Sequence, residues 1–257
     1  MAEPAKKTTL EPVEPGDAEE LLEEDDLALR VEGTRSLAFP PAVERFDLSA
    51  IKTHFDDSIS QIQAQIAEAT ELLSGEKKLS GQSILRAQIM FVESALDNYM
   101  HELVIYGVTQ MFNQTWGRTA EYDRIFLPIG VIESAAAADV GDKWLHEHIG
   151  EAYSAMTLTN VKQMRRHLDL LEIKINPCLI ATFPGHTVND AEKILKGYSE
   201  RRNDIAHRSD RDTETGVPKN ITAEEVRQMT NDIKRLVDEI HKAAEGHPLV
   251  TAVEPTP

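Results

Sequence analysis

The spacing of the large apolar residues constrains the fold of this chain more than any other feature. Between residues 85 and 103 these side chains recur at alternating steps of four and three, and they are Leu85, Ile89, Val92, Leu96, Tyr99 and Leu103. Such steps place the side chains on one face of an α-helix, whereas a half-buried strand alternates apolar and polar residues. Strand-like alternation is not found elsewhere in the sequence. The sequence therefore predicts an all-α fold built on long core helices.

Helix starts are predicted where a capping residue precedes an apolar run. Asn189 with Glu192, and Thr222 with Glu225, each form the pattern of a capping box, so we expect the last two long helices to begin there. We expect a loop around Pro177 to lead into the first of these two. Further helices are expected near 48–74, 80–113, 131–140, 142–153 and 159–171.

Composition indicates one domain with a tail at each end. With 257 residues and 41% hydrophobic content, the chain has enough apolar material for one sizeable core. Residues 1–45 are rich in acidic residues and proline and poor in large apolar groups, so we expect a flexible, disordered acidic arm. The helical domain is expected over 46–245 and a flexible tail over 246–257.

The compartment is predicted from cysteine use and from apolar runs. Cys178 is the only cysteine, which excludes an internal disulfide framework and a cysteine-based zinc cluster and favours the reducing cytoplasm. No run approaches 18 apolar residues, and the first residues lack the apolar core of a signal peptide. We therefore expect a cytoplasmic protein with no membrane partner.

Charge is distributed unevenly along the chain. The formal net charge of −17 argues against a protein that coats nucleic acid through a general basic field. Between residues 193 and 211, however, basic residues outnumber acidic ones. An anion site is therefore expected in this window.

This basic window contains an arginine, a carboxamide and an imidazole within two helical turns. They belong to Arg202, Asn203 and His207. At about 100° per residue, Asn203 and His207 share a face, whereas Arg202 and His207 diverge by roughly 140°. Guanidinium and imidazole groups can bind a phosphodiester and move a proton without a metal. Two copies of the motif meeting across a twofold axis would bring these groups around one phosphate.

The tract Tyr198–His207 resembles the HEPN superfamily, and most closely its RiboL-PSP-type ribonucleases. In that superfamily an all-helical domain carries an Arg-x4-6-His motif, usually with a polar residue after the arginine. The resemblance covers about 48–245, but only the motif and the helix after it are specific. It implies a HEPN-like helical bundle and a dimeric, metal-independent endoribonuclease, or a catalytically silent relative, with no cofactor.

The resemblance also implies roles for individual residues. His207 would be the general acid or base, Arg202 would stabilise the phosphate, and Asn203 would orient the imidazole or bind a phosphate oxygen. Candidate supporting residues are Glu93, Asp97 and Arg201. One of the two carboxylates could pair with Arg202 or orient His207, or both could belong to a solvated or intrahelical charge stripe. By analogy, such a ribonuclease acts in a toxin, stress or phage-defence setting, and RNA, a second copy and an inhibitory protein or antitoxin are the expected partners.

Other interpretations of the same residues remain open. The motif could be a helix C-terminus that favours cations, with Asp204 and Asp210 as ion-pair partners, in a helical module that binds RNA, a nucleotide or a protein without cleavage. Arg165, Arg166 and His167 could add phosphate contacts or form a solvated face. The run 146–148 contains two histidines that point to different sides of a helix, so we expect no metal there.

Overall fold

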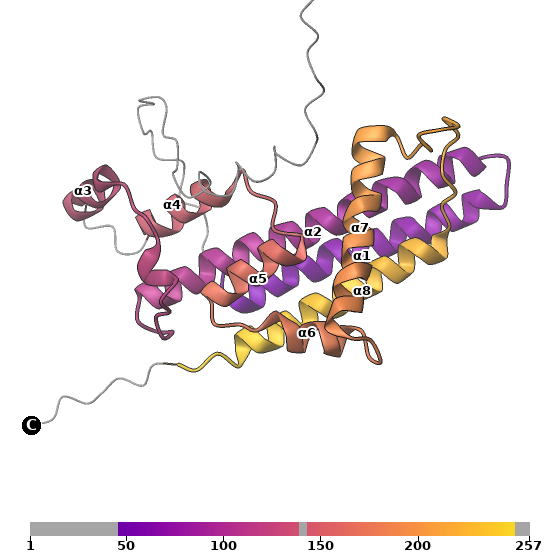
Figure 1. The fold of residues 1–257 in the computed structure, drawn as a ribbon. Helices are drawn as coiled ribbons and strands as arrows, with labels where there is room; N and C mark the ends of the chain where they lie inside the picture. Colours follow the sequence, from indigo (N-terminus) through magenta and orange to yellow (C-terminus); the bar gives the residue numbers. More distant parts are fainter. Residues whose placement is uncertain (1–45, 139–142, 250–257) are drawn as a thin grey trace, which may run out of the picture. The chain divides into compact units, whose positions relative to one another are not determined.

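The computed structural model describes residues 46–138 and 143–249 (Figure 1). The expected acidic arm over 1–45 lies outside these residues. Within the described ranges the chain is all-helical, and its only β-type pairings are two isolated bridges. The predicted all-α class is therefore confirmed. The helices are α1 Leu48–Leu73, α2 Lys78–Phe112, the short 3-10 helix η2 Tyr122–Arg124, α3 Ile129–Ala138, α4 Lys143–Tyr153, α5 Val161–Leu170, α6 Ile175–Thr182, α7 Val188–Arg208 and α8 Ala223–Glu245.

The core lies between α1, α2 and α8, which run side by side in Figure 1. All six residues of the apolar stripe predicted between 85 and 103 are buried on α2. Facing them are buried residues of α1, such as Phe55, whose ring meets the Tyr99 ring edge-on at 5.7 Å between centroids. The apolar face of α8 is buried in the same core. Apolar burial at helical spacing thus holds the three long helices together.

Helix α7 crosses this layer at a steep angle in the view of Figure 1 and packs against α2 and α6. Its inner face buries Ala191 and Leu195. The Tyr198 hydroxyl donates a hydrogen bond of 2.6 Å to Asp232 Oδ2 on α8, which fixes the middle of α7. The C-terminal half of α7, with fewer buried side chains, leaves the motif near the surface.

One predicted helix start is confirmed and the other is wrong. Thr222 and Glu225 form the capping box of α8, with both reciprocal bonds present. Helix α7 instead begins at Val188 and is capped by Thr187, whose side chain accepts from the Asp190 backbone. Thr187 and Asp190 offer the same device two residues earlier than Asn189. The Glu192 carboxylate accepts from Arg165 at 2.5 Å and takes no part in the cap.

The loop expected around Pro177 is also wrong, because Ile175–Thr182 forms α6. Pro177 is the third residue of this helix. Backbone amides in the first turn have no partner inside the helix, so the missing N–H of proline costs nothing there. Buried Ile175, Cys178 and Leu179 anchor α6 against α8. A helix of eight residues with no side-chain cap leaves little trace in the sequence.

The segment that follows α8 packs against Trp116. The His247 ring lies parallel to the Trp116 ring, with 4.0 Å between centroids and 9° between planes. Leu249 forms an isolated bridge with the Trp116 backbone. Residues 246–249 thus contact the domain, and residues 250–257 lie outside the described part. None of the described helices is both long and apolar enough to cross a bilayer.

Candidate functional site

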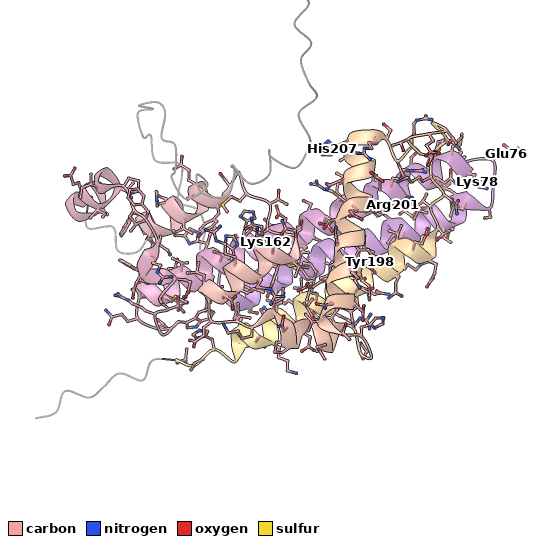
Figure 2. All side chains as sticks on the ribbon, viewed as in Figure 1. Glu76, Lys78, Lys162, Tyr198, Arg201 and His207 are labelled. Atoms are coloured by element: carbon pink, nitrogen blue, oxygen red, sulfur yellow. The ribbon has the colours of Figure 1, made fainter. Side chains whose placement is uncertain are left out.

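The motif occupies the last two turns of α7. Asn203 and His207 are exposed and Arg202 is half-buried, so none of the three lies in the interior. Figure 2 shows His207 at the C-terminal end of α7, beyond Arg201 and Tyr198 on the same helix. The helix ends at Ser209, whose φ of 52° is left-handed. This end leaves the imidazole open to solvent and to a ligand.

The three motif side chains differ in their partners. Arg202 Nη1 donates a hydrogen bond of 3.0 Å to Asn203 Oδ1, which joins the guanidinium to the carboxamide. Across residues 46–138 and 143–249, His207 has no hydrogen-bond or ion-pair partner. Because Arg202 and His207 are five residues apart on one straight helix, their side chains diverge by roughly 140°. A single copy therefore does not bring them to one point.

Glu93 of α2 lies beneath the motif. Its side chain is only 3% exposed, and Ser199 Oγ donates to its Oε1 over 3.5 Å. Burial raises the pKa of the Glu93 carboxyl, and the opposing influences of Thr159, Arg202 and Ser199 only partly offset it. Among the candidate supporting residues, Glu93 is therefore the one whose charge faces Arg202.

Asp97, one turn further along α2, holds a different segment. Its Oδ1 accepts from the Leu158 backbone at 2.6 Å, and its Oδ2 lies 3.6 Å from His101 Nε2. The interaction with the Asp97 carboxylate is the main cause that raises the pKa of His101. His101 Nε2 also lies 3.0 Å from the Met156 carbonyl oxygen. The Asp97 carboxylate thus binds the segment that joins α4 and α5 and holds this segment against α2.

Arg201 points away from the motif face and into an ion pair. Its Nη2 lies 3.0 Å from Asp210 Oδ2, and Asp210 is completely buried. Arg208 pairs with Asp204 at 3.4 Å. Both interactions match the ion pairs expected of a structural helix end. Arg202 and His207 have no such hydrogen-bonded carboxylate among the described residues.

The three sequence candidates on α5 differ in exposure. His167 is buried, Arg165 forms an ion pair with Glu192, and Arg166 is exposed. A cavity of about 440 Å³ lies where α1, α2 and α4 meet, and residues such as Glu102 and Tyr106 line it without any contribution from α7. In the described ranges no three histidine, cysteine or acidic side chains are grouped as metal ligands.

Asp210 can be identified from the sequence as an ion-pair partner, but most of the other neighbours that shape the site cannot. Ser199 and Thr159 act on Glu93, and Arg86 and Arg201 share Asp210. Nothing in the sequence marks a loop aspartate as buried. The sequence signal for this ion pair is an arginine-rich helix end that is followed within a few residues by an aspartate.

We expect Glu93→Gln to change the pH dependence of stability. Because the pKa of Glu93 is raised in the folded state, its stabilising contribution is fully present below the unfolded pKa, about 4.3, and is lost as pH rises through the higher folded value. The variant carries no such titration. Its melting temperature relative to wild type should therefore rise between pH 4 and pH 7.5.

Glu200→Gln is the matched control, because Glu200 is exposed on α7. Its melting temperature relative to wild type should stay flat over the same range. Thermal unfolding followed by circular dichroism measures both differences. A difference for Glu93→Gln that falls with rising pH would show that Arg202 outweighs burial at this carboxyl.

Comparisons of the chain with protein-family models, curated proteins and solved structures found no match. The likeness to HEPN ribonucleases therefore rests on the residues of the motif.

Proposed function

We propose that the chain is a metal-independent endoribonuclease of HEPN type that acts as a homodimer. One observation carries the proposal. At the end of α7, the neighbouring cations Arg201 and Arg208 are paired with aspartates, whereas the half-buried Arg202 and the exposed Asn203 and His207 have no hydrogen-bonded carboxylate among the described residues. A purely structural helix end would have no need to leave these three groups open.

The proposed reaction is transesterification by the RNA 2′-hydroxyl. An imidazole takes the 2′-hydroxyl proton, the 2′-oxygen bonds to phosphorus, and the bond from phosphorus to the 5′-oxygen breaks. The leaving 5′-oxygen receives a proton from an imidazolium. Imidazole serves in both roles because histidine exchanges protons near neutral pH. The products are a 2′,3′-cyclic phosphate and a 5′-hydroxyl.

Arg202 would stabilise the extra negative charge of the pentacoordinate transition state. Its guanidinium offers several N–H donors in a plane, which suits phosphate oxygens. The hydrogen bond from Arg202 to Asn203 would restrict the orientation of the guanidinium. Two copies related by a twofold axis would supply an imidazole and a guanidinium to one phosphate from opposite sides.

Such an enzyme requires restraint in its host, because unrestrained RNA cleavage is harmful. The proposal therefore includes an inhibitory protein or antitoxin, and a toxin, stress or phage-defence setting, both by analogy with the HEPN ribonucleases.

The test is cleavage of a structured RNA by the purified full chain in the presence of EDTA. We expect products that end in 2′,3′-cyclic phosphate and 5′-hydroxyl, because the mechanism uses only side chains and the 2′-hydroxyl. An RNA with a single 2′-deoxy substitution at the cut site is the matched control and should resist cleavage there. Cleavage that needs a metal, or products with 5′-phosphate, would contradict the proposal, and no cleavage of any RNA would favour a non-catalytic binding module.

A further inference from the structure

Asp210 is completely buried although it lies in the polar connection between α7 and α8. Two arginines from different helices donate to the same oxygen of its carboxylate. Arg86 Nε of α2 lies 2.7 Å from Asp210 Oδ2, and Arg201 Nη2 of α7 lies 3.0 Å from it. Desolvation of a lone carboxylate is costly, so Asp210 is held inside only while both cations face it.

The same two arginines also bind backbone carbonyls at the C-terminal end of the connection between α7 and α8. Arg86 Nη2 donates to the Lys219 carbonyl at 2.7 Å, and Arg201 Nη2 donates to the Asn220 carbonyl at 2.8 Å. The Lys219 backbone N–H donates to the Asp210 carbonyl at 2.7 Å. The two ends of the connection are thus tied to each other and to α2. We call Arg86, Asp210 and Arg201 the arginine clamp.

The arginine clamp is joined directly to the backbone of the motif. The Asp210 N–H donates to the Asp204 carbonyl at 2.9 Å, and the Ser209 N–H donates to the same oxygen. Asp204 lies between Asn203 and His207 on α7, and its carboxylate forms an ion pair with Lys219. The last turn of α7 is therefore fixed from both its main chain and its side chains.

The backbone at the end of α7 is held in an uncommon conformation. Ser209 and Asp210 have φ values of 52° and 54°, which are left-handed and unfavourable for residues with a Cβ. Such a conformation persists where surrounding contacts determine it. The contacts that determine it here are those of the arginine clamp.

We propose that Asp210 is a positioning residue for the site, and that the arginine clamp sets the direction in which the last turn of α7 presents His207. For its effect on cleavage, the proposal rests on the proposed ribonuclease function. It assigns Arg201 to holding Asp210 instead of binding phosphate. Arg86, which is 124 positions from Asp210 in sequence, becomes part of the same device.

Asp210→Asn removes the charge and keeps the size. The asparagine carbonyl can accept from the arginines, but its amide group then lies at the position of Asp210 Oδ1, which is buried without a hydrogen-bond partner in the described part of the chain. Two half-buried guanidinium groups are left facing a neutral group. We expect the connection to loosen and the last turn of α7 to fray.

The expected results are faster hydrogen exchange and slower cleavage. Backbone amides of residues 204–208 should exchange at least about tenfold faster in Asp210→Asn than in wild type. Well below the melting temperature of the variant, kcat should fall about 10- to 100-fold while KM changes less than about threefold, because a displaced acid–base group impairs the reaction more than binding. Arg86→Lys keeps the positive charge, but its ammonium group cannot bind both the Asp210 carboxylate and the Lys219 carbonyl. Its increase in exchange and its decrease in kcat should therefore be smaller than those of Asp210→Asn.

Asp212→Asn is the matched control two residues away. The Asp212 carboxylate accepts hydrogen bonds from Glu214 and Thr215 within the connection itself and does not reach α7. This variant should keep wild-type exchange over 204–208 and wild-type kcat.

Exchange requires no RNA, so it separates the two proposals. A wild-type protein that cleaves nothing would defeat the ribonuclease proposal and leave the arginine clamp to be judged by exchange alone. Unchanged exchange over 204–208 in Asp210→Asn would overturn the clamp. If Asp210→Asn does not fold, the same exchange measurement on Arg86→Lys decides whether the arginine clamp positions α7. An increase in exchange in Asp212→Asn as large as that in Asp210→Asn would also overturn the proposal.

Discussion

His207→Ala should reduce RNA cleavage by about 10²- to 10⁴-fold, which is the range that a positioned acid–base group contributes. The imidazole is the only group of the motif that can carry a proton to or from the reacting oxygens at neutral pH. Its loss should lower kcat at every pH, since the other two groups of the motif, a guanidinium and a carboxamide, do not exchange protons near neutral pH. Initial rates on a structured RNA in EDTA measure the effect.

The same change should leave folding intact. His207 is exposed and has no hydrogen-bond or ion-pair partner within the described ranges, so its replacement is expected to alter the free energy of unfolding by about 0.5 kcal/mol or less. Melting temperatures of variant and wild type should therefore coincide. This combination distinguishes an acid–base residue from a structural one.

His186→Ala provides the control for the loss of an exposed histidine. His186 lies just before the start of α7, whereas the motif lies at the other end of that helix. The His186 ring is 6.4 Å from the Phe183 ring. Cleavage should remain at the wild-type rate. If His207→Ala cleaves RNA as fast as wild type, the activity does not belong to this motif. That result would favour a structural or binding role for the motif without catalysis.

The helical core could be predicted because its signal repeats. Each buried residue of the α2 stripe is separated from the next by three or four positions, and that spacing determines the inward face whatever the partner helix is. Glu93 lies four positions after Ile89 and three before Leu96, at the edge of the buried stripe. A carboxylate at that edge also suits a solvated charge stripe, so its burial at 3% exposure is a finding of the structure.

Predictions that depended on one local choice were less secure. Thr187 and Asn189 both suit a helix start, and the chain uses the earlier one because Asp190 is placed to complete its cap. Helix α6 is not evident from the sequence because proline is typical of a break, although the first turn of a helix tolerates it. In both cases neighbouring residues compete for one role, and spacing does not decide between them.

The environment of the motif could not be predicted, because it depends on residues distant in sequence. The burial of Asp210 requires a cation from α2, and no local pattern connects it to Arg86. The buried Asp210 forms an ion pair with Arg201, whereas Arg202 has no hydrogen-bonded carboxylate among the described residues. A motif can thus be located from the sequence, whereas the division of its cations between structure and surface requires the tertiary fold.

Subunit mixing should restore activity if each site combines groups from two copies. Arg202 and His207 diverge by roughly 140° on α7, so the proposed site takes the arginine of one copy and the histidine of the other. In a dimer of one Arg202→Ala copy and one His207→Ala copy, one site loses both groups and the other keeps both. Such dimers should recover about half of the wild-type activity, whereas either variant alone stays inactive.

Two tags, one on each copy, allow these mixed dimers to be purified after co-expression. The reciprocal control pairs a wild-type copy with a copy that carries both Arg202→Ala and His207→Ala. A composite site predicts that this control is inactive, because each site then lacks one group. A site built within one copy predicts the reverse pattern, with the control active at about half and the mixed single variants inactive. Failure to recover any doubly tagged species would show that the copies do not associate, and the divergence of Arg202 and His207 would then leave no way to bring both groups to one phosphate.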